Sequence, residues 1–307
     1  MSSHPLLFIG SAAADVVMRL PSLPLPGEDL HVASQTVTLG GCALNAFRAA
    51  RLLTSRPLLP FFPVGTGVWG DFVHSALVAQ DIQTLIPRPD APNGCCYCLV
   101  TPDGERTFLC DHGAEYRFRP EWFDALPDDV AAAYLCGLEV EEDTGDVILD
   151  YLESHPPRQL FFAPGPRLCH IPPRKMARVM ALHPVFHLSE QEACRFTHTL
   201  SAEDAAPMIH RLTGAPVIIT KGAEGAYLFS ADFTGTLPAC PVTVADTIGA
   251  GDAHIGAVIA LTAEGHSLQE AVGLANRVSA AVVASQGAEV TPETLLNIWP
   301  DAPLASK

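Results

Sequence analysis

An α/β fold with a mainly parallel central sheet is what this sequence predicts, and three observations support that prediction. Short apolar runs alternate with segments of helical periodicity, as in proteins whose sheet is covered by helices on both faces. Most of the glycine turns follow predicted strands, at the edge where open α/β sheets bind ligands. Two β-rich stretches, at about residues 16–39 and 94–111, break the alternation and predict strands that leave the core. We therefore expect one domain over residues 1–307 with a small second element built from these strands.

The first predicted elements lie between the N-terminus and a glycine pair. Residues 6–10 are an apolar run ending in glycine, which predicts a buried strand. Residues 20–30 contain three prolines, which forbid a helix and favour an extended segment. Residues 31–41 have β-branched residues in partial alternation and predict strands. From Asn45 onward the apolar residues fall at helical spacing, so Gly40 and Gly41 mark a strand-to-helix turn.

The remaining elements follow the same logic of strand, turn and helix. Residues 95–110 predict a hairpin around the Pro102-Asp103-Gly104 turn. Ser189 is a plausible N-cap where a strand runs into a helix. The other predicted elements are a strand, turn and helix start at 61–72, buried strands at 132–140 and 159–166, the strand and helix at 185–193, two strands joined by a glycine turn at 216–229, and helices at 253–261 and 271–284.

Composition and charge exclude several classes of partner. Lys and Arg number 18 and Asp and Glu number 34, which gives a net charge of −16. A chain with this charge repels nucleic acid and anionic membrane surfaces, so we expect neither as a partner. A small anionic ligand would need a local site made of backbone N–H groups, a helix N-terminus or a few cations.

The sequence also bears on the cell compartment. It contains no run of about 18 apolar residues, so no membrane span is expected, and its first ten residues make a poor signal peptide. The nine cysteines are then expected to be free thiols in a reducing cytosol, which predicts a cytoplasmic protein. Cys95, Cys96 and Cys98 lack the second cluster that zinc sites need, so strand packing is favoured over metal binding.

The segment DTIGAGD, which begins at Asp246, carries the clearest chemical signal. A Gly-Ala-Gly turn that opens a helix exposes unpaired N–H groups, and its small side chains let a ligand approach the backbone. The helix dipole adds partial positive charge, so Gly249, Ala250 and Gly251 can form an anion hole for a phosphoryl group. Asp252 can take a proton from an attacking hydroxyl as a general base. Asp246 can help to position a cation.

The same segment is compatible with a purely structural role and is distinct from two known phosphate-binding motifs. Asp252 can instead be a helix N-cap and the glycines a tight turn, since caps of this kind are common. A P-loop is excluded because no Gly-Lys-Ser/Thr follows. The dinucleotide fingerprint is excluded because His254 stands three residues after Gly251. We expect His254 itself to pack in the interior.

Two separated motifs resemble the ribokinase-like (PfkB) family of carbohydrate kinases. GGCALNAFRAARLL, at residues 40–53, is similar to the family's sugar-binding turn and helix, and DTIGAGDAH, at residues 246–254, is similar to its C-terminal signature. Supporting matches lie between them in the same order, so the resemblance runs from about residue 6 to 290. Within the family, GGCALN, PDGERTF and DTIGAGD look most like uncharacterised bacterial sugar kinases of the YegV type.

The resemblance implies a three-layer α/β/α core with a small β lid, and transfer of the γ-phosphoryl group of ATP, with Mg²⁺, to a sugar hydroxyl. It makes Asp252 the catalytic base and the Gly249–Gly251 turn the anion hole. Arg106, on the lid, would cover the substrate or pair with a phosphate, and the alternative is an exposed cross-strand partner. The residues implied to hold sugar hydroxyls are Asp15, Gly40, Gly41, Asn45 and Glu139.

The resemblance also implies nucleotide and cation sites. Glu192 matches the acidic end of an Asn-x-x-Glu motif that organises Mg²⁺ through water, although it can also be a first-turn helix carboxylate. Ser189 stands where the family has asparagine, and water can fill the gap that its shorter side chain leaves. The nucleotide would lie along Thr220, Lys221, Gly222 and Gly225, with Asn276 near the adenine. Lys221 can alternatively be a solvated turn lysine. A monovalent cation such as K⁺ would bind carbonyl groups at Asp246, Ile248, Val283, Gln286 and Gly287.

Three functions stay open on the sequence alone. The leading one is ATP-dependent phosphorylation of a sugar. The second is phosphorylation of a nucleoside, which needs a flat apolar slot for the base next to Asp15 and Asn45. The third is a ligand sensor without catalysis, against which the intact Asp252 argues while Ser189 gives it some support. Lid strands with unpaired edges predict a homodimer.

Overall fold

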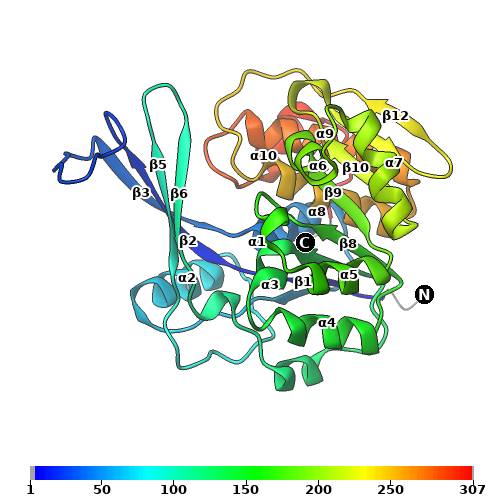
Figure 1. Ribbon diagram of the computed structural model, residues 1–307, viewed down its shortest axis with the longest axis horizontal. Coiled ribbons are helices and arrows are strands. Elements are labelled where there is room, and N and C mark those ends of the chain that lie inside the picture. The colour runs from blue at the N-terminus through cyan, green and yellow to red at the C-terminus, as the bar shows by residue number, and fades with distance from the viewer. Residues whose placement is uncertain (1–3, 306–307) are drawn as a thin grey trace.

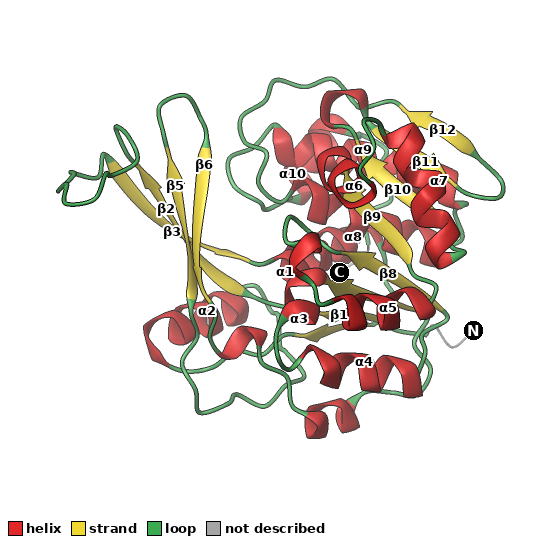
Figure 2. Ribbon diagram, viewed as in Figure 1, coloured by secondary structure: helices red, strands yellow, loops and turns green. Residues whose placement is uncertain are grey.

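The computed structural model describes residues 4–305 and contains two sheets (Figures 1 and 2). The larger sheet has eight strands in the order β12-β11-β10-β9-β8-β7-β1-β4. All neighbouring strands pair in parallel except that β11, next to the edge, is antiparallel to both β10 and β12. The strands are β1 (Leu6–Ile9), β4 (Leu58–Phe61), β7 (Ala132–Cys136), β8 (Gln159–Ala163), β9 (Val185–Ser189), β10 (Val217–Thr220), β11 (Ala226–Phe229) and β12 (Thr234–Leu237). The prediction of a mainly parallel central sheet is confirmed.

Helices cover both faces of this sheet and complete three layers. Because side chains alternate along a strand, Leu6 and Phe8 of β1 enter one apolar core while Leu7 and Ile9 enter the other. The first core lies under α1 (Cys42–Leu53), α2 (Gly67–Ala79), α8 (Ala250–Ala263), α9 (Leu268–Val283) and α10 (Pro292–Ile298). The second lies under α3 (Gly137–Glu141), α4 (Gly145–Ser154), α5 (Pro173–Ala181), α6 (Glu190–Thr197) and α7 (Ala202–Thr213). Within residues 4–305, no helix combines the length and the hydropathy needed to cross a bilayer.

Four strands form a separate sheet that projects from one side of the core, on the left of Figure 1. We call this sheet the lid. Its order is β3-β2-β5-β6, with β2 and β5 parallel and the outer pairs antiparallel. The strands are β2 (Ala13–Arg19), β3 (Ser34–Gly40), β5 (Cys95–Val100) and β6 (Arg106–Asp111). The run from Cys95 is therefore a strand, as predicted, and β5 and β6 form the predicted hairpin.

Two element starts differ from the prediction. Strand β2 begins at Ala13, before the expected position near residue 16. Helix α1 begins at Cys42 and not at Asn45, because Gly41 adopts a φ of 109° and serves as the N-cap. The helix start thus follows directly from the glycine pair, and apolar spacing alone placed it one turn too late.

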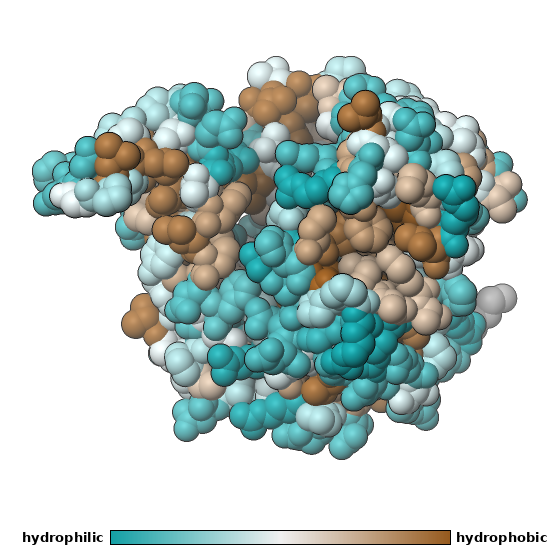
Figure 3. All heavy atoms as spheres, viewed as in Figure 1, coloured by the Kyte–Doolittle hydropathy of each residue, from teal (hydrophilic) through white to brown (hydrophobic). Residues whose placement is uncertain are grey.

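The two faces of the lid differ in what they meet. Val16 and Tyr97 pack against the first apolar core. The registers of β2, β5 and β6 place three cross-strand rows on the opposite face: Asp15-Cys96-Cys110, Val17-Cys98-Phe108 and Arg19-Val100-Arg106. Arg106 reaches the body of the protein from this face, so the face is turned toward the body, and we call it the inner face. The space-filling view shows a hollow between the lid and the body, toward the top of Figure 3.

Candidate active site

The site is built where α1 and α8 cross at very close range. A Cβ atom on Gly256 of α8 would lie 2.0 Å from the carbonyl oxygen of Ala46 in α1, so only glycine permits this crossing. The crossing brings together two side chains that are 207 residues apart in the chain: Asn45 Nδ2 donates a hydrogen bond to Asp252 Oδ2 at 3.0 Å. The predicted sugar residue and the predicted base are therefore direct partners.

The Gly-Ala-Gly turn stands immediately before Asp252. Gly249 is the N-cap of α8 with φ 74°, and a Cβ there would lie 2.5 Å from that of Ala288, so the turn requires glycine. Asp252 is the third residue of the helix, so the alternative interpretation of Asp252 as an N-cap is wrong. Within the described chain, the backbone N–H groups of Gly251 and Asp252 have no acceptor. These N–H groups, at the positive end of a helix dipole, can bind an anion.

Burial raises the pKa of the acidic groups at the site. Burial, with a smaller contribution from Glu192, raises the pKa of Asp252 to about 6, although hydrogen bonds from Asn45 and Cys42 oppose the rise. Burial raises the pKa of Asp15 to about 7, and the neighbouring Cys110 and Asp252 add to the effect. Asp252 is consequently ionised at neutral pH but remains basic enough to accept a proton.

Several buried polar atoms near this acid have no hydrogen-bond partner within the part of the chain that the structure describes. They are Ser11 Oγ, Asn45 Oδ1 and both carboxylate oxygens of Glu139. Glu139 is fully buried next to Gly10, and burial raises its pKa to about 7 against the opposing effects of Ser11, Cys136 and His112. Buried polar groups are almost always satisfied, so this set suits a ligand rich in hydroxyl groups.

The glycine pair fits the same part of the site. A Cβ on Gly40 would lie 1.9 Å from Asp15 Oδ2, so the carboxylate packs directly on the backbone of residue 40. Gly41 begins α1, which carries Asn45 into the site. Gly40, Gly41, Asp15 and Asn45 thus lie close together at the root of the lid, where β2 and β3 join the body.

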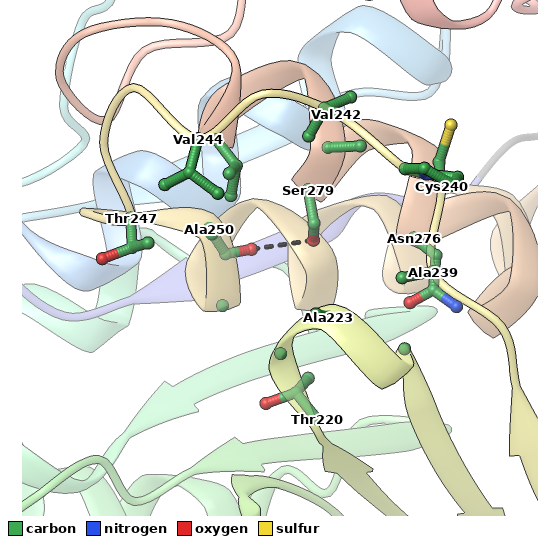
Figure 4. A pocket seen from close by; sticks show the side chains of 16 residues that line it. Thr220, Ala223, Ala239, Cys240, Val242, Val244, Thr247, Ala250, Asn276 and Ser279 are labelled. Atoms are coloured by element: carbon green, nitrogen blue, oxygen red, sulfur yellow. Dashed lines mark hydrogen bonds between the residues drawn. The ribbon is translucent and has the colours of Figure 1, made fainter.

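A cavity of about 460 Å³ adjoins the Gly-Ala-Gly turn (Figure 4). One end is lined by Ala250 and Gly251, and Ser279 holds the turn by donating from Oγ to the Ala250 carbonyl at 3.0 Å. Its walls are mainly apolar and include Val242 and Val244 (Figure 4). Of the predicted nucleotide residues, the cavity is lined by Thr220, Gly222, Gly225 and Asn276. An apolar slot of this volume that ends at free N–H groups suits a flat base joined to phosphates.

Two predicted nucleotide residues have other partners in the structure. Lys221 Nζ lies 3.0 Å from a carboxylate oxygen of Glu203 and 3.2 Å from one of Glu224, and Lys221 does not line the cavity. Both acids hold the pKa of Lys221 above its usual value. Asn276 lines the cavity, but its Nδ2 donates to the carbonyls of Leu237 and Pro238, so its amide N–H groups are already in use.

Ser189 and Glu192 form a capping box at the start of α6. Ser189 Oγ accepts from the Glu192 N–H, and Glu192 Oε2 accepts from the Ser189 N–H at 2.9 Å. The predicted N-cap is confirmed. The other carboxylate oxygen of Glu192 makes no hydrogen bond within residues 4–305. The charge of Glu192 adds to the raised pKa of Asp252, so the two carboxylates lie close enough to interact. Within the described residues, no group of three or more His, Cys, Asp or Glu side chains is arranged to hold a metal.

Asp246 ties the lid to the anion-hole turn. Its Oδ1 accepts from Arg106 Nη2 at 2.6 Å and from the Ile248 N–H at 3.0 Å, while Oδ2 accepts from the Gly287 N–H at 3.3 Å. Arg106 also donates to Thr247 Oγ1 at 2.9 Å. Arg106 therefore does not behave as an exposed cross-strand residue but as a contact between the lid and the body.

The five carbonyl positions predicted for a monovalent cation do not fit equally well. The carbonyl of Val283 accepts N–H groups from both Ala245 and Asp246, so its two lone pairs are in use. Val283 is therefore not free to bind a cation in this arrangement. The carbonyls of Asp246, Ile248, Gln286 and Gly287 accept no backbone N–H group within residues 4–305.

Sequence reasoning missed three cysteines that lie at the site. Cys42 contacts Asp252 from the first turn of α1. Cys96 and Cys110 lie in the same row as Asp15 on the inner face of the lid. The signal for Cys96 was present in the sequence, because strand alternation places it on the face opposite Cys95 and Tyr97.

Comparison with known proteins gives consistent results over nearly the whole chain. The family model described as pfkB family carbohydrate kinase matches residues 3–295. The chain is 34% identical over 292 residues to an uncharacterized sugar kinase, YegV, of Escherichia coli strain K12, covering 94% of this chain and 91% of that protein. It is 27% identical over 291 residues to ribokinase of Bacillus subtilis, covering 92% of this chain and 93% of the relative.

Solved structures share the fold. The structure of Arabidopsis thaliana ribokinase complexed with ribose and ATP aligns with a TM-score of 0.77 at 19% identity, covering 96% of this chain and 98% of that one. At this level of identity the likeness establishes a common architecture of core and lid.

Proposed function

Because the chain belongs to the pfkB family of carbohydrate kinases, we propose that it transfers the γ-phosphoryl group of ATP to a sugar hydroxyl with Asp252 as the general base. One observation carries this proposal: Asp252, paired with Asn45, directly follows the Gly-Ala-Gly turn, and Ala250 and Gly251 of that turn line an apolar cavity. The Arabidopsis ribokinase was solved with ribose and ATP, which supports a sugar and ATP as the two substrates.

In the proposed mechanism, the sugar lies at the root of the lid and ATP lies in the cavity. The carboxylate of Asp15 and the unpartnered oxygens of Asn45 and Glu139 accept hydrogen bonds from sugar hydroxyls. The attacking hydroxyl loses its proton to Asp252 as the γ-phosphoryl group arrives in line. The N–H groups of Gly251 and Asp252 stabilise the charge on the transferred group. The lid excludes water, which suppresses hydrolysis of ATP.

The carboxylate of Glu192 fits the way in which proteins normally hold Mg²⁺. Mg²⁺ keeps several waters and binds one or two carboxylates together with substrate phosphates. Glu192 provides such a carboxylate through the oxygen that the capping box does not use, and its charge acts on Asp252. The bound ion would neutralise negative charge on the phosphates. For K⁺, we propose the carbonyls of Asp246, Ile248, Gln286 and Gly287 as ligands.

A nucleoside is the second candidate for the acceptor. Phe108 lies on the inner face of the lid and is 54% exposed, which offers a flat apolar surface for a base. Aminoimidazole riboside kinase of Salmonella typhimurium is 33% identical over 242 residues, covering 71% of this chain and 74% of that protein. Its name describes a riboside as the acceptor, which supports this alternative.

The experiment that separates these possibilities is a coupled assay of ADP release with a panel of acceptors. The panel contains pentoses, hexoses, ketoses, sugar acids and nucleosides. Saturable ADP release with a free sugar supports the leading proposal, and release with nucleosides only supports the alternative. If ATP is never consumed although one acceptor binds tightly, the protein is a ligand sensor and both kinase proposals fail.

We also propose that the protein is a cytoplasmic homodimer. The edges of the lid, β3 and β6, pair with no other strand in the described part of the chain, and Leu109 beside one edge is 56% exposed. Exposed strand edges favour association with a second copy. ATP and reduced thiols are both available in the cytoplasm. Light scattering at micromolar concentration tests the dimer, and a monomeric mass would refute it.

A further inference from the structure

Two cysteines face each other across the lid, in the row that contains Asp15. Cys96 of β5 and Cys110 of β6 are partners in the antiparallel register, and their Sγ atoms are 3.4 Å apart. Cys110 is exposed and Cys96 is half-buried. Both lie on the inner face, because Cys96 is in turn the register partner of Asp15 in β2. The two thiols are thus close to each other, accessible and next to the sugar site proposed above.

A histidine and a glutamate complete this cluster. His112 directly follows β6, and its ring contacts the Cys110 thiol. His112 Nδ1 lies 2.6 Å from Glu142 Oε1, and its ring stacks on Tyr116 with centroids 4.1 Å apart. The glutamate fixes the ring and favours its protonated form, as in sites where a histidine supports a cysteine nucleophile.

The charges around Cys110 favour its thiolate. Contact with Cys96 and with His112 lowers the pKa of the Cys110 thiol against the opposing effect of burial, and the charge of Arg167 adds to the lowering. Contact with Cys110, and then with Glu142, raises the pKa of His112 to about 9. The same contact raises the pKa of Cys96, which stays protonated. The pair therefore consists of one thiolate and one thiol at neutral pH.

We propose that Cys110 is a modification site for hydrogen peroxide and that Cys96 converts the product to a disulfide across the lid. The Cys110 thiolate attacks one oxygen of the peroxide, the O–O bond breaks, and the departing oxygen takes a proton from His112 and leaves as water. Cys110 is then a sulfenic acid. The Cys96 sulfur attacks this sulfenic sulfur, the S–S bond forms, the S–O bond breaks, and the hydroxyl leaves with the Cys96 proton as water. Two electrons pass from the thiols to one peroxide, which yields two waters.

The disulfide would alter the sugar site, and this part of the inference rests on the function proposed above. An S–S bond is about 2.05 Å long, so the two sulfurs must approach by more than about 1 Å from their present 3.4 Å. Strands β5 and β6 have to adjust to this approach beside Asp15. The oxidised lid is therefore expected to bind the sugar more weakly, with recovery when a thiol reductant opens the bond.

The test uses the full-length reduced protein and hydrogen peroxide, followed by mass spectrometry. The expected product has lost two hydrogen atoms and yields a peptide pair that joins Cys96 to Cys110. Cys96→Ser is expected to stop at a sulfenic acid on Cys110 that dimedone traps. Cys169, an exposed cysteine outside the lid, is the internal control, and Cys169→Ser is the matched variant. Alkylation at pH 6.5 is expected to be at least about tenfold faster at Cys110 than at Cys169.

Three results would overturn the inference. Equal alkylation rates at Cys110 and Cys169 would refute the activated thiolate. Peroxide treatment that yields no bond, or a bond to another cysteine, would refute the resolving role of Cys96. An unchanged KM for the sugar in the disulfide form would refute the link to the sugar site. Absence of kinase activity with every acceptor would instead refute the proposed function, because the thiol measurements do not depend on turnover.

Discussion

Replacing Asp252 with asparagine tests the proposed base by two independent readouts. The amide has the shape of the carboxylate, and its oxygen can still accept the hydrogen bond from Asn45 that holds Asp252 at 3.0 Å. It cannot accept the proton of an attacking hydroxyl. Positioned general bases contribute roughly 10²- to 10⁴-fold, so kcat should fall by about that factor while both substrates still bind.

The same substitution should stabilise the fold at neutral pH. Burial raises the pKa of Asp252 from 3.8 to about 6, which means that the folded state disfavours the charged form. A shift of about two units corresponds to about 3 kcal/mol at pH 7, where the group is ionised in both states. This penalty is relieved as the pH falls from about 6 toward 4, because the folded protein then takes up the proton. Asparagine carries no charge and removes this penalty, although its amide group must still be hydrogen-bonded. We therefore expect the free energy of unfolding at pH 7 to rise by about 1 to 2 kcal/mol.

The assay combines steady-state kinetics with denaturant unfolding at pH 7 and at pH 4. Asp232→Asn, at an exposed position, is the matched control and should change neither quantity. Turnover of Asp252→Asn within tenfold of the unmodified protein would exclude proton transfer to this residue. A free energy of unfolding that falls at pH 7 would refute the argument from burial.

Three further predictions concern the surroundings of this acid. Asn45→Ala removes the hydrogen bond that lowers the pKa of Asp252, so the acid limb of kcat, expected near pH 6, should move up by about one unit in a pH–rate profile. An unmoved limb would contradict the assignment. Arg106→Gln breaks the partly exposed contact with Asp246, so transition-state stabilisation should fall by about 1 kcal/mol, which corresponds to about a fivefold fall in kcat/KM. An unchanged kcat/KM would show that the contact does not contribute to catalysis. Gly251→Val places a side chain in open space beside the cavity, so the free energy of unfolding should change by no more than about 0.5 kcal/mol while the KM for ATP rises in steady-state assays. An unaltered KM would place ATP elsewhere.

Much of the architecture could be predicted from local patterns. The apolar run at residues 6–10 becomes β1, and the Pro102-Asp103-Gly104 turn joins β5 to β6. The anion-hole turn and Asp252 could be placed together because they are contiguous and open one helix. In each case the physical cause lies within about ten residues of sequence, where periodicity and turn chemistry are informative.

Contacts between distant segments were harder to predict. Asn45 meets Asp252 because Gly256 lets α1 and α8 approach, and a glycine within a helical pattern does not reveal which helix it admits. Family resemblance placed Lys221 along the nucleotide, but Lys221 does not line the cavity. The structure instead pairs it with Glu203, which lies in α7. Family resemblance gave Asn45 and Asp252 separate roles without pairing them, so both contacts are known only from the fold.

The most direct test of the central claim is a crystal structure with a sugar and a non-hydrolysable analogue of ATP. The account predicts that oxygens of the terminal phosphate accept hydrogen bonds from the N–H groups of Gly251 and Asp252 at about 2.7 to 3.1 Å. It also predicts that a sugar hydroxyl lies about 2.6 to 3.2 Å from the Asp252 carboxylate. A terminal phosphate bound away from this turn, or a sugar with no hydroxyl within reach of Asp252, would contradict the account.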